Sequence, residues 1–221
     1  MGDAARWPTF DLRLRTPRLE LRPYREADIP ALIEAARSGI HDPGYMPFGV
    51  AWTDAPSPEF ERNWYRHYWQ VLATTSPEKW ALMFAVYVDD EPIGIQDVGA
   101  DAFPTLRTVL SGSWLRADRQ GEGLGKEMRT AILTLAFDGL GAEVATSGSR
   151  TDNHSSIGVS RAMGYDEDGF DRMAPRGEAV EVIRWRLRRD RFEELRASGH
   201  YAKWEPVEIE GLDPVRDLLG L

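Results

Sequence analysis

The stretch Arg119-Gln-Gly-Glu-Gly-Leu-Gly-Lys126 places three glycines at alternate positions, directly before an apolar pattern of helical period. Glycine adopts backbone conformations that are closed to other residues, so consecutive N–H groups in this stretch can point into one concavity. The helix that follows adds the positive end of its dipole, and Arg119 and Lys126 add full charges. The stretch therefore predicts an anion-binding loop between a strand and a helix, with pyrophosphate as a suitable guest.

Two other kinds of phosphate-binding loop do not fit this stretch. A P-loop needs Gly six residues before the Lys and Ser or Thr after it, where this sequence has Gln120 and Glu127. A dinucleotide-binding loop needs a third glycine where Lys126 stands, and it lies near the first strand of a βαβ unit rather than in mid-chain. The loop is therefore neither a P-loop nor a dinucleotide fingerprint.

The chain before the loop alternates between strand and helix patterns. Residues 12–21 alternate apolar and polar side chains around Thr16-Pro17, which predicts one strand interrupted or entered at the proline. A helix is predicted over Glu26–Arg37, a long loop over Ile40–Pro58, and an aromatic-rich helix over Glu59–Leu72. The spacing of its aromatic residues favours a core-facing stripe over a substrate-facing lid.

Strand patterns then precede the loop and helix patterns follow it. Strands are predicted over Trp80–Val88, Pro92–Val98 and Leu106–Leu115, which together form an antiparallel meander. After the loop the expected elements are a helix including Met128–Ala136, a strand over Glu143–Ser147, a helix over Asn153–Met163, a strand over Val180–Leu187, and a charged helix with an irregular tail from Arg188 onward.

Composition narrows the possible functions. The 221 residues are 42% hydrophobic and suit one large domain, and the absence of cysteine excludes disulfides, thiolate metal sites and a cysteine nucleophile. The longest apolar runs fall short of the roughly 20 residues of a membrane span, and no secretory signal is recognisable, so a cytoplasmic location is expected. A net charge of −9 disfavours nucleic acid and suits cationic partners such as amines, although it also simply aids solubility.

Three motifs resemble one family when they are taken together. Gln120, Gly123 and Gly125 form a Gln-x-x-Gly-x-Gly pattern that is similar to the acyl-CoA loop of the GNAT superfamily. Residues 16–28, Thr-Pro-Arg-Leu-Glu-Leu-Arg-Pro followed by Glu-Ala-Asp, resemble the opening of its ribosomal-protein-alanine acetyltransferase (RimJ/RimL) branch. Asn153-His-Ser-Ser156, followed by Gly164-Tyr165, resembles the second CoA motif of that branch. Without this context, the loop could be only a glycine-rich turn closing a strand.

The resemblance runs from about Leu12 to Leu187 and implies an α/β (α+β) fold, with a mostly antiparallel twisted sheet that splays open at an acyl-CoA site. It implies a GNAT domain over residues 1–188 and a C-terminal extension, residues 189–221, that packs on the domain or on a partner subunit. Acetyl-CoA or succinyl-CoA would be the co-substrate, with no metal. The implied CoA-binding residues are Trp114, Leu115, Arg119, Gln120, Gly121, Glu122, Gly123, Leu124, Gly125, Lys126, Asn153 and Ser156.

The implied chemistry is direct attack of a neutral amine on a thioester, which needs a base for the amine proton and an acid for the departing thiolate. Ser156 is the acid candidate by its place in the second motif, although a serine there could also be a surface or capping residue. Many relatives have a glutamate two residues before a strand glycine, where this chain has Leu110 before Gly112. This departure leaves the base unassigned, and Asp97, at the end of an apolar strand, is a candidate that could project into the splay.

Three other residues could also supply the base, namely His41, Asp42 and His154, although composition favours a solvated polar residue for each of the four, Asp97 included. The resulting expectation is an N-acyltransferase that moves an acetyl or succinyl group to a primary amine of a protein N-terminus, a lysine or a small molecule. The alternative is a catalytically weak GNAT-like protein that binds or senses acyl-CoA. The residues after Arg188 could also form a homo-oligomer.

Overall fold

The computed structural model describes residues 7–221. The strands are β1 (Arg13–Arg15), β2 (Glu20–Pro23), β3 (Lys79–Val88), β4 (Glu91–Asp101), β5 (Thr108–Leu115), β6 (Val144–Arg150), β7 (Asp166–Met173), β8 (Val180–Arg188) and β9 (Glu208–Glu210). The helices are α1 (Ile29–Arg37), α2 (Glu59–Thr74), α3 (Phe103–Leu106), α4 (Leu124–Thr134), α5 (His154–Ala162), α6 (Arg189–Ala197) and α7 (Leu212–Leu219). A π-helical turn, Leu135–Gly139, extends α4.

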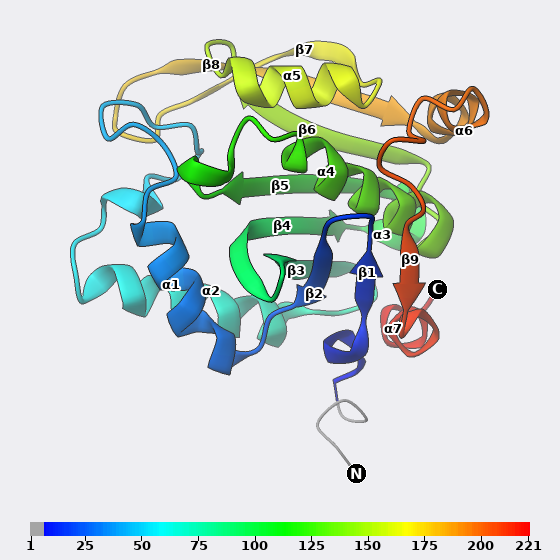
Figure 1. The fold of residues 1–221 in the computed structure, drawn as a ribbon, viewed down its shortest axis with the longest axis horizontal. Coiled ribbons are helices and arrows are strands. Elements are labelled where there is room, and N and C mark those ends of the chain that lie inside the picture. The colour runs from blue at the N-terminus through cyan, green and yellow to red at the C-terminus, as the bar shows by residue number, and fades with distance from the viewer. Residues whose placement is uncertain (1–6) are drawn as a thin grey trace.

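The described strands form one sheet in the order β7-β8-β6-β5-β4-β3-β2-β1-β9 (Figure 1). All neighbours in it are antiparallel except β5 and β6, which are parallel. The parallel pair is joined by the glycine loop and α4, as a parallel connection requires a crossover. This is the mixed, mostly antiparallel sheet that the resemblance implies.

Helices pack on both faces of the sheet and enclose two separate cores. The larger core combines one sheet face with α4, α5, α6 and α7, and includes fully buried side chains such as Phe84, Phe137 and Trp185. The smaller core lies under α1 and α2 and is rich in aromatics, including Tyr24, Trp64 and Tyr68. The aromatic stripe of α2 is thus mainly a core stripe, because its buried residues are Phe60, Trp64 and Tyr68.

The parallel strands β5 and β6 pair along only part of their length. Their register runs from Thr108↔Val144 to Leu110↔Thr146, and no pairing follows beyond these residues. The next residues are held by side chains instead, since the Ser147 hydroxyl donates to the carbonyl of Ser111 at 3.3 Å. The sheet therefore splays open beyond Leu110, on the side that faces the glycine loop.

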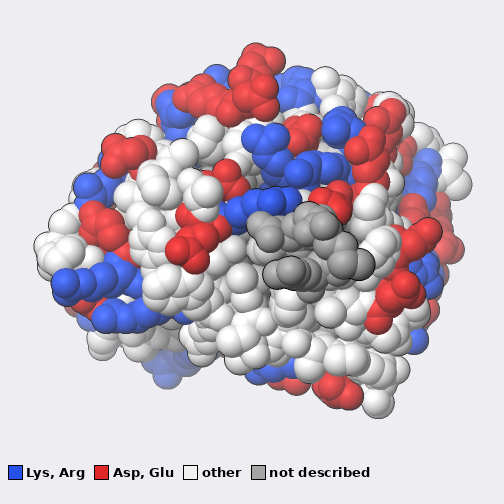
Figure 2. Space-filling view, turned by 90° about the horizontal axis from the view of Figure 1, so that it is seen from below, with Lys and Arg blue, Asp and Glu red and all other residues white. Residues whose placement is uncertain are grey.

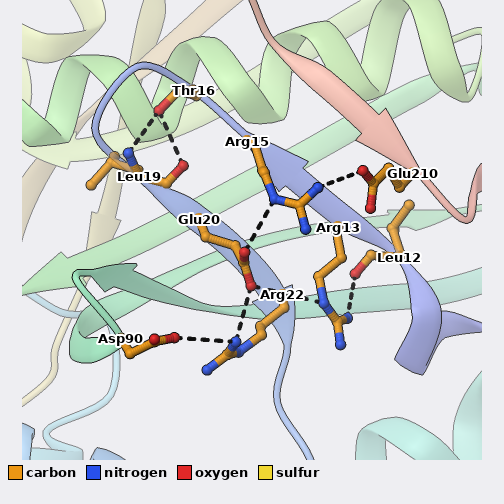
Figure 3. A network of polar contacts seen from close by, with 9 residues as sticks. All are labelled: Leu12, Arg13, Arg15, Thr16, Leu19, Glu20, Arg22, Asp90 and Glu210. Carbon is orange, nitrogen blue, oxygen red and sulfur yellow. Dashed lines mark hydrogen bonds and ion pairs between the residues drawn. The ribbon is translucent and has the colours of Figure 1, made fainter.

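The N-terminal segment differs from the expected single strand. It forms a hairpin in which Leu14 pairs with Leu21, and the intervening turn is held by the N–H of Leu19, which donates to the Thr16 hydroxyl at 3.1 Å (Figure 3). Pro17 lies in that turn, where its missing N–H breaks no ladder hydrogen bond. The alternating pattern was compatible with both arrangements, and the proline marks a reversal of the chain.

The C-terminal extension packs against the same domain. Strand β9 pairs with β1, with Ile209 opposite Leu14, and Arg15 bonds to Glu210 across that pair (Figure 3). Val215 and Leu219 of α7 are fully buried in the larger core. Strands β7 and β9 were not expected: both are short edge strands in which charged residues predominate, so the apolar alternation is weak.

Charges on the visible surface are mixed in sign. On the face shown in Figure 2, acidic and basic side chains lie interspersed rather than gathered by sign. The network of Figure 3 shows such mixing at close range, because Glu20 lies between Arg15 and Arg22. Among the helices of residues 7–221, none is long and apolar enough to cross a membrane.

Candidate active site

The glycine loop has the backbone geometry that the sequence predicts. Gly121 and Gly123 have φ values of +81° and +83°, which L-residues rarely adopt, and Gly123 is the N-cap of α4. Within residues 7–221, the N–H groups of residues 121–125 donate no turn, loop or cap hydrogen bond. These N–H groups and the helix N-terminus form a ready site for an anion.

Gln120 and Arg119 have different roles at the loop. The Gln120 amide donates to the carbonyl oxygens of Ile40 at 2.8 Å and Leu115 at 2.9 Å, so it ties the end of β5 to the segment after α1. Arg119 lines the cleft, and its nearest acidic partner is Glu122 at 3.8 Å. Gln120 therefore positions the loop, whereas Arg119 is available to a phosphate.

An ion pair that was not predicted from the sequence lies at the base of the loop. Glu127 is fully buried, and its carboxylate accepts hydrogen bonds from Thr16 Oγ1 at 2.7 Å, Arg18 N at 2.9 Å and Arg18 Nε at 2.7 Å. Arg18 Nη1 also donates to the carbonyl of Glu122, within the loop, at 3.1 Å. The Thr16–Arg18 turn thereby holds both the start of α4 and the glycine loop.

A cleft of about 730 Å³ opens where β5 and β6 diverge, and the glycine loop lies at its edge. Most of the residues expected to bind CoA line this cleft: Trp114, Leu115, Arg119, Gln120, Gly121, Gly123, Gly125, Lys126, Asn153 and Ser156. Two of the expected residues do not. Leu124 is 2% exposed and belongs to the larger core, and Glu122 points to solvent beside Arg119.

The two ends of the cleft wall come from β5 and α5. Main-chain atoms of Trp114 and Leu115 lie at the end of β5, while the Trp114 ring packs near Trp52 and Trp64, with centroids 6.0 and 6.2 Å away. Across the cleft, the side-chain oxygen Oδ1 of Asn153 caps α5 by accepting from the Ser156 N–H at 3.1 Å. Asn153 is thus the helix cap, which leaves the Ser156 hydroxyl free of that structural role.

Asp97 lies behind the cleft wall rather than in it. Its Oδ1 accepts a hydrogen bond from the Gly112 N–H at 2.6 Å, and Gly112 itself lines the cleft. A Cβ at residue 112 would stand only 3.1 Å from Oδ1 and 3.3 Å from Oδ2. Glycine at this position therefore lets the Asp97 carboxylate pack closely against the β5 backbone that lines the cleft.

Burial raises the pKa of Asp97, and the Gly112 N–H and the charges of Arg129 and His67 oppose that rise. A carboxylate with a raised pKa is a better proton acceptor than a solvated one. Leu110, at the position where relatives have a glutamate, is 60% exposed and supplies no titratable group. Among the base candidates, Asp97 is the one whose carboxylate is buried against the β5 wall of the cleft.

The other base candidates all line the cleft, but their environments differ. The His41 ring nitrogens contact Thr53 Oγ1 and the carbonyl of Asp42, both at 2.9 Å. The Asp42 carboxylate accepts from the Gly44 N–H at 2.7 Å and so shapes its own turn. His154 is exposed at the first turn of α5. His41 and Asp42 are therefore largely occupied by local structure.

The long loop over Ile40–Pro58 forms one wall of the cleft. Tyr45 donates its hydroxyl hydrogen to Asp152 at 2.9 Å, and Arg150 donates to the carbonyl of Met46 at 2.9 Å. Burial and the Asp152 hydrogen bond raise the pKa of Tyr45 to about 12, so the phenol stays protonated at neutral pH. The loop is thus anchored to the β6–α5 connection across the open end of the splay.

The polar side chains at the closed end of the splay were also not predicted from the sequence. Arg129, on α4, is 5% exposed and lines the cleft together with Ser111, Ser113, Ser147 and Ser149. Its guanidinium donates to Ser147 Oγ at 3.2 Å and Ser113 Oγ at 3.4 Å. The sequence does contain a signal for this polar lining, because small polar residues occupy alternate positions in β5 and β6. A strand that faces the core would have apolar side chains at these positions.

Solved acetyltransferases share this architecture. Mycobacterium smegmatis RimJ in complex with CoA-disulfide superposes with a TM-score of 0.71 at 21% identity, covering 88% of this chain and 96% of that chain. RimL, a ribosomal L7/L12 alpha-N-protein acetyltransferase solved with coenzyme A, gives 0.61 at 18% identity, with 79% and 96% covered. The spermidine/spermine N-acetyltransferase SpeG from Vibrio cholerae gives 0.61 at 14% identity, with 81% and 98% covered.

At such identities these structures establish a common fold. The sequence comparison is more specific, because residues 18–166 match the family described as "Acetyltransferase (GNAT) domain". That stretch spans well over half of the 221 residues and contains both the glycine loop and the Asn153–Ser156 motif. This chain therefore belongs to the GNAT acetyltransferase family.

Proposed function

We propose that this protein transfers an acyl group from acyl-CoA to a primary amine. The observation that carries the proposal is the cleft between β5 and β6, with unbonded loop N–H groups at its mouth. The pyrophosphate of CoA would lie on residues 121–126, and the pantetheine would run along the β5 main chain toward Trp114. The RimJ and RimL structures, which hold CoA, support this use of the fold.

In the proposed reaction the amine nitrogen attacks the thioester carbonyl, and the carbon–sulfur bond breaks as the amide forms. Asp97, which accepts the Gly112 N–H at the cleft wall, would accept the amine proton, directly or by way of a water. Ser156 would give a proton to the departing thiolate, because its hydroxyl lies in the cleft wall and is not the cap of α5. Main-chain N–H groups of β5 would stabilise the developing oxyanion.

The acceptor is a primary amine, and three sources of amine are compatible with the site: a protein N-terminus, a lysine and a small molecule. RimL acts on a protein N-terminus and SpeG on spermidine and spermine, so both acceptor types occur on this fold. An α-amine has a pKa of about 7.7–8.0 and a lysine amine a pKa of about 10.4, so an α-amine loses its proton to the base more easily. Oligomerisation through residues 189–221 and a cytoplasmic location stay predictions.

The test combines CoA binding with product detection. Gly123→Glu would introduce a negative charge and a side chain at a left-handed position, so calorimetric CoA affinity should fall relative to the parent. Unchanged affinity would remove the loop from the CoA site. Incubation of the parent with acetyl-CoA and an amine panel should release thiol and yield an acylated amine by mass spectrometry. CoA binding without any thiol release would instead support the acyl-CoA-binding alternative.

A further inference from the structure

Aromatic rings gather at one end of the cleft, beside the end of β5. Phe48 and Trp114 line the cleft, and both rings pack on Trp52, with centroids 5.3 and 6.0 Å from the Trp52 ring. His41 also lines the cleft, and its ring meets Phe48 edge-on with centroids 5.6 Å apart. The rings of His41, Phe48 and Trp114 therefore form a continuous aromatic wall.

The aromatic wall belongs to the face of the sheet on which the proposed base lies. Gly112 and Trp114 are two residues apart on β5, so they share one face, and Gly112 is opposite Asp97 of β4. Ser113, between them, belongs to the other face and contacts Arg129 of α4. An amine that gives its proton to Asp97 would therefore lie on the same side of β5 as the aromatic wall.

The loop that carries Phe48 is fastened across the open end of the splay. Arg176, in the turn between β7 and β8, donates to both carboxylate oxygens of Asp54 at 2.7 Å and to the carbonyl of Pro43 at 3.0 Å. Figure 1 shows the segment after α1 reaching this β7–β8 turn. A second attachment joins the loop to the β6–α5 connection. The aromatic wall is thus built before an acceptor binds, which lowers the entropic cost of binding.

The charges around the cleft disfavour an acceptor with a second positive charge. Asp42 is the one carboxylate among the described residues that line the cleft, and it is exposed and accepts from the Gly44 N–H at 2.7 Å. Arg119, Lys126 and Arg129 line the same cleft. A second ammonium group would need a counter-charge here, whereas an apolar group needs none. Apolar surroundings also disfavour the ammonium form of the reacting amine, and the neutral amine is the form that attacks.

We propose that the acceptor is a primary amine on a short chain that ends in an aromatic ring, and that Phe48 and Trp114 hold this ring. The inference rests on the proposed acyl transfer and names its acceptor class. The amine nitrogen forms the amide and its proton passes to Asp97, while CoA leaves as the thiol with a proton from Ser156. The aromatic ring is unchanged. An amine two carbons from a ring occurs both in arylethylamines and at the N-terminus of a polypeptide that begins with phenylalanine.

The test compares amines that differ in the group beyond the reacting nitrogen. Phenethylamine has an aromatic ring where butylamine has a short alkyl chain, and spermidine has further ammonium groups. Thiol release from acetyl-CoA gives kcat/KM for each amine with the parent protein. Phenethylamine should exceed butylamine by roughly 10- to 100-fold, mainly through a lower KM, because the ring is buried against other rings. Equal values for these two amines, or a preference for spermidine, would overturn the inference.

Two peptides distinguish the sources of the ring. One tetrapeptide begins with phenylalanine and the other with alanine, and both continue with three glycines. A higher kcat/KM for the phenylalanine peptide than for phenethylamine would assign the site to a polypeptide N-terminus, and the reverse order would assign it to a small arylalkylamine. Both results support an aromatic acceptor. A preference for the alanine peptide over both aromatic acceptors would overturn it.

Variants then assign the preference to the aromatic wall. Phe48→Leu keeps an apolar side chain but removes the ring, so the ratio of kcat/KM between phenethylamine and butylamine should fall by roughly 5- to 10-fold. Phe170→Leu is the matched control, because it removes a 57% exposed ring of β7 that does not line the cleft, and it should keep the ratio. If Phe48→Leu slowed both amines equally, Phe48 would only shape its loop, and the inference would be wrong.

The outcome separates this inference from the proposed function. Turnover of butylamine or spermidine without a preference for phenethylamine would overturn the acceptor class and leave the acyltransferase intact. Failure of the parent to release thiol with any amine would overturn the proposed function and the inference with it. Circular dichroism of each variant verifies folding, and a misfolded Phe48→Leu leaves the parent's comparison of amines as the deciding measurement.

Discussion

Replacing Arg18 by methionine probes the ion pair that holds the glycine loop. Glu127 is fully buried and would keep two hydrogen bonds, from Thr16 and from the residue 18 N–H, while losing Arg18 Nε and the Nη2 contact, both at 2.7 Å. Breaking a buried pair costs about 3–5 kcal/mol. Arg18 itself is 44% exposed, so water can approach that side of the carboxylate and a loss of about 2 kcal/mol is expected.

For a chain of this length, about 2 kcal/mol corresponds to a drop in melting temperature of roughly 4–8 °C, measured by calorimetry or circular dichroism. Lys79→Met is the control, because its pair with Asp101 is 64% and 76% exposed and contributes at most about 1 kcal/mol. A drop no larger than that of Lys79→Met would refute the reasoning that Glu127 depends on Arg18.

The same variant should weaken CoA binding, because Arg18 Nη1 also holds the Glu122 carbonyl inside the loop. Loss of one such hydrogen bond predicts a roughly 3- to 10-fold higher dissociation constant for CoA, measured by titration calorimetry. A lower melting temperature with unchanged CoA affinity would mean that Arg18 stabilises the N-terminal hairpin and α4 without shaping the loop.

The remaining predictions concern proton transfer. Burial raises the pKa of Asp97 above the value of about 3.9 that the group has in the unfolded chain. Asp97 therefore contributes its full stabilisation at a pH below the unfolded pKa, and this contribution is lost as the pH rises through the folded pKa. Asp97→Asn should therefore be at least as stable as the parent at neutral pH, while kcat falls by about 100-fold or more; an unaltered kcat would exclude Asp97 as the base. Gly112→Ala would place a Cβ 3.1 Å from that carboxylate and displace it, so kcat should fall more than CoA affinity, and the reverse order would argue against a catalytic role for this contact. Ser156→Ala should lower turnover with CoA affinity retained, and parent-like turnover at saturating donor would remove Ser156 from the mechanism.

The features predicted from sequence are those that short stretches encode. The conformation of Gly121 and Gly123 follows from the residues themselves, and the helix over residues 124–134 follows from its apolar period. The strands β3 to β5 were also predicted close to their observed limits, because each has an apolar run bounded by turn residues. Local information was sufficient for the loop, the helix after it and the meander before it.

The features that the sequence did not reveal depend on contacts between distant segments. Arg18 and Glu127 are separated by 109 residues, and each alone resembles an ordinary charged surface residue. The edge strand β7 has charged side chains on both faces, so its strand pattern is weak, and its pairing with β8 defines it. Asp97 was recognised as a candidate from its strand, but its contact with Gly112 depends on the pairing of β4 with β5.

Helix α4 shows why a buried charge must be interpreted together with its partner. Every residue from Glu127 to Thr134 is buried, so neither Glu127 nor Arg129 lies on a solvated face that would explain its charge. Glu127 is balanced within the chain by Arg18, and its charge is therefore structural. Arg129, two residues later, lines the cleft and donates its hydrogen bonds to serine hydroxyl groups. Both charges bear a similar cost of burial, and for Arg129 that cost is offset in part by the buried carboxylate of Asp97, since the Arg129 charge opposes the rise in the pKa of Asp97.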